Sequence, residues 1–94
     1  GGILMRKVRM RVTGRVQGVG FRFMTKMVAD QLGIRGCATN EDDGSVVIEA
    51  MGPDEALETF IEKVKASPAP YGRVASFTLT EDPTIELRQK FYTN

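Results

Sequence analysis

The chain has 94 residues, which is enough for a single domain over residues 1–94 and too few for two. Thirteen Lys and Arg against twelve Asp and Glu give a net charge of +1, and no apolar run approaches the roughly 20 residues of a membrane span, so we expect neither nucleic acid nor a membrane as partner. The absence of histidine excludes Ser-His-Asp and Cys-His nucleophile pairs and most zinc sites, and we expect no metal and no cofactor.

The first predicted element is a half-buried strand over residues 7–12. Val8, Met10 and Val12 alternate with basic residues, and this period of two is typical of a strand with one face in the core. We interpret the basic side chains as a solvated strand face rather than a nucleic-acid contact. Gly1–Leu4, which precede this strand, we interpret as a remnant of cloning.

A loop is predicted from Gly14 to Gly20, because this segment contains three glycines and no regular period. A helix is predicted from Phe21 to Leu32. Apolar residues recur in it at helical spacing: Phe23, Met24, Met27, Val28 and Leu32. Gly33 then stands where helices commonly end.

Two further strands are predicted at Ile34–Asn40 and Ser45–Met51, around the hairpin turn signal Asp43-Gly44. The single cysteine, Cys37, excludes an internal disulfide and favours a reducing compartment, so we expect the protein to be cytoplasmic.

A second helix opens at Pro53, because proline suits a first helical turn. Its apolar stripe consists of Leu57, Phe60, Ile61 and Val64. After a loop at Ser67–Gly72, a fourth strand is predicted at Arg73–Thr80. One side of it carries Ala75, Phe77 and Leu79. A short fifth strand is possible within Glu86–Tyr92.

The predicted order is therefore βαββαβ with a possible fifth edge strand. Two helices on one face of an antiparallel sheet make a two-layer α+β sandwich of the ferredoxin-like kind. This arrangement hosts enzymes, metal carriers and RNA-binding domains, so the function has to be read from the site.

The segment Gly14–Arg22 has the features of a phosphate site. It joins a strand to a helix start, where backbone N–H groups are unsatisfied and the helix dipole is positive. Glycines allow those N–H groups to converge on an oxyanion, and Arg22 adds a planar charged fork. The segment lacks the motifs of P-loop and dinucleotide-binding proteins. Taken alone, it is equally compatible with a purely structural turn.

Asn40 is the second candidate, at the end of a predicted strand. Its amide can donate to and accept from a water molecule and so hold it in place. Taken alone, an asparagine beside a hairpin is more often a turn former. The acids Asp42 and Asp43 fall short of a calcium site and are interpreted as turn residues.

Together the two segments resemble the acylphosphatase family. The first signature of that family resembles G-x-V-Q-G-V-x-F-R, which Gly14–Arg22 matches in full. The second resembles G-W-V-x-N-x-x-D-G-S-V. It is matched here at Gly36, Asn40, Asp43, Gly44, Ser45 and Val46. Cys37-Ala38 replaces the usual Trp-Val and is expected to change packing beside the site. The resemblance covers essentially the whole domain.

The resemblance implies hydrolysis of small acyl phosphates, without metal or covalent phosphoenzyme, by a chain that we expect to be a monomer. It implies that Arg22 binds the phosphoryl group and that Asn40 positions the attacking water. It also implies a phosphate cradle made by the backbone N–H groups of Val16, Gln17, Gly18, Val19 and Gly20. Inorganic phosphate is then expected to be a competitive product inhibitor.

Two other functions are weighed against this one. The first is a non-catalytic module that binds an acyl or carbamoyl phosphate, such as occurs within larger carbamoyl-transfer proteins. The second is an RNA-binding sheet, which needs aromatic residues on its central strands. Neither Val8–Val12 nor Ser45–Met51 contains an aromatic residue, which disfavours RNA binding.

Overall fold

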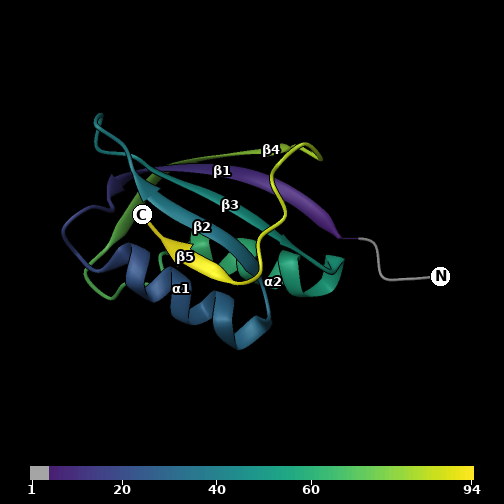
Figure 1. Ribbon diagram of the computed structural model, residues 1–94. Coiled ribbons are helices and arrows are strands. Elements are labelled where there is room, and N and C mark those ends of the chain that lie inside the picture. Colours follow the sequence, from purple (N-terminus) through teal and green to yellow (C-terminus); the bar gives the residue numbers. More distant parts are fainter. Residues whose placement is uncertain (1–4) are drawn as a thin grey trace.

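The structure is a computed structural model that describes residues 5–94 (Figure 1). Its elements are, in chain order, β1 (Arg6–Arg15), α1 (Phe21–Leu32), β2 (Arg35–Asn40), β3 (Val46–Gly52), α2 (Asp54–Lys65), β4 (Arg73–Glu81) and β5 (Phe91–Thr93). The predicted βαββαβ order with a fifth strand is confirmed. The interpretation of Gly1–Leu4 as a cloning remnant concerns residues outside the described range.

The five strands form one sheet in the order β4-β1-β3-β2-β5, and both helices cover the same face of it (Figure 1). The first four strands pair antiparallel, as predicted. The fifth strand, β5, pairs parallel to β2, so the sheet is mixed at this edge. It is also shorter and later than the Glu86–Tyr92 segment expected, because residues 82–90 form a connection before β5 begins.

The core lies between the sheet and the helices. The alternating residues Val8, Met10 and Val12 of β1 are fully buried, as their spacing predicts. The stripe of α2 is buried as well: Leu57, Phe60, Ile61 and Val64. Within residues 5–94, neither helix has the length and apolar content that crossing a bilayer requires.

Of the apolar residues predicted along α1, Met24, Val28 and Leu32 pack partly buried against the core, whereas Phe23 and Met27 do not. Phe21, Thr25 and Ala29 are its buried residues. Phe23 is 62% exposed and Met27 is 42% exposed. Small side chains at Thr25 and Ala29 allow the helix to lie close against the sheet, and this packing turns Phe23 and Met27 toward solvent.

The predicted inner face of β4 is correct at two positions and wrong at one. Phe77 and Leu79 are half-buried, but Ala75 is exposed. The pairing of β1 with β4 shifts register between Thr13 and Gly14, and this bulge leaves Ala75 without a partner. An extra residue reverses the alternation of the strand beyond it, which a period of two cannot anticipate.

The basic residues between the buried positions of β1 pair with acids. Arg9 contacts Glu49 at 2.9 Å and Asp82 at 2.6 Å, and Arg11 contacts Asp43. The open face of the sheet therefore carries compensated charges, in keeping with a solvated strand face.

Candidate active site

The loop between β1 and α1 has the backbone form of an anion-binding nest. Gly18 and Gly20 have φ angles of 76° and 78°, in the left-handed region that favours glycine. Left-handed residues that alternate with ordinary ones turn successive N–H groups toward one concave surface. A Cβ atom at either glycine would meet nothing within 4 Å, so the space beside the loop is open.

The backbone N–H groups of this loop have no acceptor among residues 5–94. Within residues 5–94, none of the backbone N–H groups from Val16 to Gly20 donates a hydrogen bond to a protein acceptor. The helix α1 begins after Gly20 without a side-chain cap and without an acidic residue in its first turn. The positive end of the helix dipole is therefore uncompensated by the protein and open to an anion.

One cavity of about 410 Å³ brings this loop together with both predicted catalytic residues. It is lined by Val16, Gly18, Gly20, Phe21, Arg22, Phe23, Lys26, Asn40 and Thr93. Gln17 and Val19 do not line it, so a cradle role for these two rests on their backbone N–H groups and stays a prediction. Arg22 comes from the first turn of α1 and Asn40 from the last residue of β2.

The guanidinium of Arg22 is oriented by the C-terminal segment. Its Nη1 donates to the backbone carbonyl of Asn94. Asn94 is itself held to β2, since its backbone N–H donates to the Ala38 carbonyl at 2.9 Å and its Nδ2 to Thr39 Oγ1 at 3.0 Å. Sequence reasoning missed this contact, because no spacing links Arg22 to a residue so distant along the chain.

The side-chain oxygen of Asn40 is an unused acceptor. Its Oδ1 is buried and has no hydrogen-bond partner among the residues described. A buried polar atom without a partner is uncommon and indicates a place for a water or ligand. The atom belongs to a residue of the cavity wall, where a water molecule could donate to it.

A side-chain contact holds the loop against the hairpin that carries Asn40. The Nε2 of Gln17 donates to the carbonyl oxygens of Glu41 at 2.8 Å and Ser45 at 2.9 Å. From the sequence, only the backbone of Gln17 is expected to take part in the site. The sequence signal for this contact is a polar amide side chain within an apolar, glycine-rich loop.

Asp43 has a local structural role in its turn, and Asp42 is exposed in the same turn. Asp43 Oδ1 accepts from the hydroxyl of Ser45 at 2.6 Å and from its backbone N–H at 2.9 Å. These hydrogen bonds hold the pKa of the Asp43 carboxyl below its ordinary value. Within residues 5–94, no group of three or more His, Cys, Asp or Glu side chains is arranged to hold a metal ion.

Cys37 lies away from the cavity. It is 4% exposed, and its Sγ lies 3.6 Å from Glu49 Oε1. Burial raises the pKa of the thiol, with a further contribution from the nearby carboxylate. A neutral, buried thiol fills space in β2 and is a poor nucleophile.

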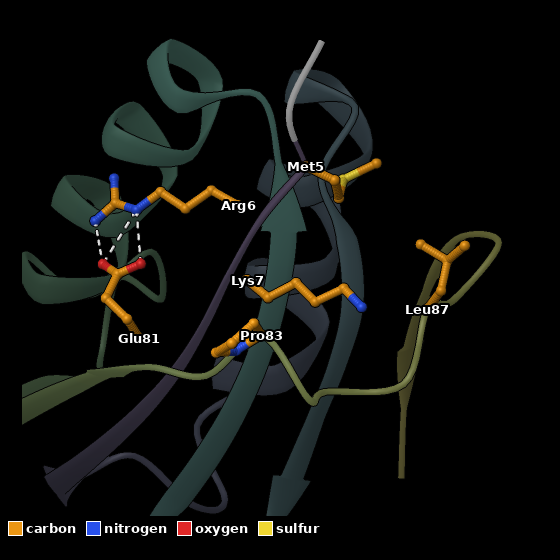
Figure 2. Close-up of a pocket in the computed structure, with 6 residues that line it drawn as sticks. All are labelled: Met5, Arg6, Lys7, Glu81, Pro83 and Leu87. Carbon is orange, nitrogen blue, oxygen red and sulfur yellow. Dashed lines mark hydrogen bonds and ion pairs between the residues drawn. The ribbon is translucent and has the colours of Figure 1, made fainter. Parts of the chain in front are cut away.

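A second cavity lies at the opposite end of β1 (Figure 2). It has a volume of about 590 Å³ and is lined by Met5, Arg6, Lys7, Glu81, Pro83 and Leu87. Its cations are already engaged: Arg6 bonds to Glu81, and Lys7 Nζ donates to the Ile85 carbonyl at 2.7 Å. Both cations of this cavity thus have partners among residues 5–94, unlike the loop amides near Arg22.

Comparison with known proteins gives a consistent result. The family model described as Acylphosphatase matches residues 8–93. The acylphosphatase of Enterococcus faecalis is 60% identical over 87 residues, which cover 93% of this chain and 96% of that protein. The crystal structure of acylphosphatase from Bacillus subtilis superposes with a TM-score of 0.89 and 40% identity, covering 97% of this chain and 99% of that one. The structure of T. kodakarensis HypF has a TM-score of 0.81 and 28% identity, over 94% of this chain but only 12% of that one.

Proposed function

This chain belongs to the acylphosphatase family and hydrolyses acyl phosphates, and from that premise we propose how its residues carry out the reaction. The loop amides of Val16–Gly20 and the guanidinium of Arg22 bind the phosphoryl oxygens. Asn40 orients a water molecule for in-line attack on phosphorus. The observation that carries this proposal is the single cavity that the loop, Arg22 and Asn40 line together.

Binding the phosphoryl group and orienting the water molecule are sufficient to catalyse this reaction. Phosphoryl transfer commonly passes through a loose transition state with charge spread over the phosphoryl oxygens, so fixed donors and positioning lower the barrier. The planar fork of Arg22 can contact two of these oxygens at once. The free N–H groups of the loop supply further donors that need no reorganisation as the charge develops.

The leaving group of the substrate needs no acid from the protein. A carboxylate leaves without protonation, because the pKa of its conjugate acid is roughly 4. Neither Arg22 nor Asn40 can act as a base at neutral pH. The proton of the attacking water therefore passes to the phosphoryl oxygens or to bulk water, and the reaction needs no general acid, metal or covalent phosphoenzyme.

The same chemistry sets the selectivity. A phosphate monoester must expel an alkoxide, which is a poor leaving group without an acid, and so should be hydrolysed very slowly. Inorganic phosphate matches the donors that hold the phosphoryl group and should inhibit competitively.

The alternative of a non-catalytic module that binds an acyl or carbamoyl phosphate is less well supported. The likeness to T. kodakarensis HypF involves a small part of that protein. The acylphosphatases, in contrast, match over nearly the whole of both chains. The presence of Asn40 with a free oxygen also favours turnover over mere binding.

A hydrolysis assay tests the proposal. Benzoyl phosphate should be hydrolysed at an unchanged rate in the presence of a metal chelator. An alkyl phosphate monoester at the same concentration should be left intact, and inorganic phosphate should raise KM without changing kcat. Loss of activity with the chelator, or equal rates with the monoester, would refute the mechanism.

We also propose that the protein acts as a monomer in the cytoplasm. The cavity is lined by residues of one chain, so catalysis does not require a second copy. The single cysteine suits a reducing compartment. Sedimentation at micromolar concentration should give the mass of one chain.

A further inference from the structure

The cavity at Arg22 is larger than a phosphoryl group needs. A water molecule takes about 30 Å³ in the liquid, and this cavity, which is open to solvent, has a volume of about 410 Å³. The loop, Arg22 and Asn40 account for the phosphoryl end and the attacking water. The remaining wall, along the first turns of α1, includes Phe23 and Lys26, to which the proposed mechanism gives no role.

Phe23 is an exposed apolar residue in the wall of this cavity. It is 62% exposed although α1 packs against the sheet, and it follows directly after Arg22 in the first turn of the helix. Single exposed apolar residues are common on protein surfaces. What distinguishes Phe23 is that it forms part of the wall of the cavity that takes the phosphoryl group.

The charge of the neighbouring cation is partly offset by an acid of the same helix. Lys26 Nζ pairs with Asp30 Oδ2 at 2.8 Å, one turn further along α1. This carboxylate offsets the ammonium charge, so the pair gives little advantage to an acyl group that ends in a second anion. The side chains of Phe21 and Val16, which also line the cavity, are apolar and buried.

We propose that Phe23 is the specificity residue for the acyl group, and that the enzyme favours acyl phosphates with an aromatic or other apolar acyl group over acetyl phosphate. This inference rests on the proposed function, because it takes the phosphoryl group to be bound by the loop and Arg22. The acyl group then extends past Arg22 onto the ring of Phe23, where it removes apolar surface from water.

The test compares benzoyl phosphate with acetyl phosphate for the wild type, Phe23→Ala and Met27→Ala. The two acyl phosphates differ in intrinsic reactivity, so the quantity that matters is how each variant changes the ratio of their kcat/KM values. Phe23→Ala should lower the benzoyl-to-acetyl ratio roughly three- to tenfold, the range expected for one aromatic contact. The change should lie mainly in KM, because the contact is made equally in ground and transition states.

Met27→Ala is the matched control. Met27 is also an exposed apolar residue of α1, one turn beyond Phe23, but it does not line the cavity. Its replacement should leave both kcat/KM values unchanged. Alanine is a good helix former, so both variants should keep the helix, which circular dichroism verifies. A benzoyl-to-acetyl ratio that Phe23→Ala leaves unchanged would overturn the proposal.

A binding measurement separates this inference from the catalytic proposal. Benzoylphosphonate and acetylphosphonate mimic the two substrates but are not hydrolysed. Phe23→Ala should weaken the binding of benzoylphosphonate more than that of acetylphosphonate, as measured by calorimetry. Equal effects on both ligands would refute the role of Phe23. Failure of the wild type to hydrolyse either acyl phosphate would instead refute the proposed function.

Discussion

Arg22 combines three features of the site in one residue: it lies in the first turn of α1, it lines the cavity, and its guanidinium contacts the C-terminal segment. Its charge therefore adds to the positive end of the helix next to the loop amides. Among residues 5–94, the guanidinium donates from one nitrogen to Asn94, which leaves the others available for phosphoryl oxygens.

Arg22→Ala should weaken phosphate binding and remove most of the turnover. Loss of a charge-assisted contact of about 1.5–3 kcal/mol per hydrogen bond predicts a fall in kcat/KM of roughly 10²-fold or more. Arg22→Lys keeps the charge but not the fork, so it should recover part of the phosphate inhibition and little of the turnover. Full activity of Arg22→Ala on benzoyl phosphate would remove this residue from the mechanism.

Cys37, in contrast to Arg22, is predicted not to be needed for turnover. Because its thiol is buried, has a raised pKa and lies outside the cavity, Cys37→Ala should keep kcat/KM within about twofold of the wild type. The free energy of unfolding should fall by about 1 kcal/mol, since a small buried group is lost. Loss of turnover in a variant that remains folded would show that the thiol takes part in the reaction.

At the scale of elements, the loop from Val16 to Gly20 is the part that must keep its shape. Gly18 is left-handed and has open space around it, so Gly18→Ala strains the backbone without a steric clash. The variant should lose about 1–2 kcal/mol of stability. It should also lose tenfold or more in kcat/KM, because the N–H groups no longer converge.

Gly33→Ala is the control for Gly18→Ala. Gly33 is also left-handed, with a φ angle of 71° and open space around it, but it caps the far end of α1. Its replacement should reduce the unfolding free energy by a similar amount and leave kinetics unchanged. Equal loss of activity in both variants would mean that stability, not loop shape, limits the reaction.

The elements themselves follow closely from local patterns, and the departures have tertiary causes. The alternation of apolar residues in β1 and the apolar stripe of α2 predict the buried faces correctly, because these residues lie on one continuous face of each element. The outward turn of Phe23 depends on how α1 packs against the sheet. The exposure of Ala75 depends on a bulge in its pairing with β1. The bulge is not encoded in the spacing of apolar residues, whereas Phe23 lies on the helix face opposite Met24 and Val28.

The candidate site likewise has parts that the sequence predicts and parts that only the structure shows. Arg22, Asn40 and the loop could be identified because each lies in a short segment with its own chemical pattern. Their convergence on one cavity is a property of the fold. The tether from Gln17 to the hairpin and the contact of Asn94 with Arg22 join segments that are distant in sequence, so only the structure reveals them.

At the scale of the whole molecule, an ion-pair network on the open face of the sheet links three segments. Glu49 of β3 contacts Arg9 of β1 at 2.9 Å and Arg88 of the connection before β5 at 3.2 Å. Burial alone would raise the pKa of Glu49, but hydrogen bonds from both arginines outweigh it and hold the pKa below its ordinary value of 4.5. The Glu49 carboxylate therefore binds a proton more tightly in the unfolded state than in the folded state. Its ion pairs stabilise the fold above about pH 4.5, and this stabilisation is lost as the pH falls further.

Glu49→Gln should therefore reduce stability at pH 7, by about 1–2 kcal/mol, and make stability less sensitive to acid. Thermal melts of the wild type and the variant between pH 3 and pH 7 measure this directly. The two curves should converge as the pH falls below about 4. Parallel curves over the whole range would show that Glu49 does not contribute to acid sensitivity.

The central claim is that phosphate binding and water positioning belong to different residues, and Asn40→Ala tests it most directly. The variant should lose roughly 10²–10³-fold in kcat for benzoyl phosphate, by analogy with the loss of one preorganised polar group. Its inhibition constant for inorganic phosphate should remain within about twofold of the wild type, because the loop amides and Arg22 are untouched. A variant that binds phosphate poorly yet turns over bound substrate at the normal rate would contradict the account.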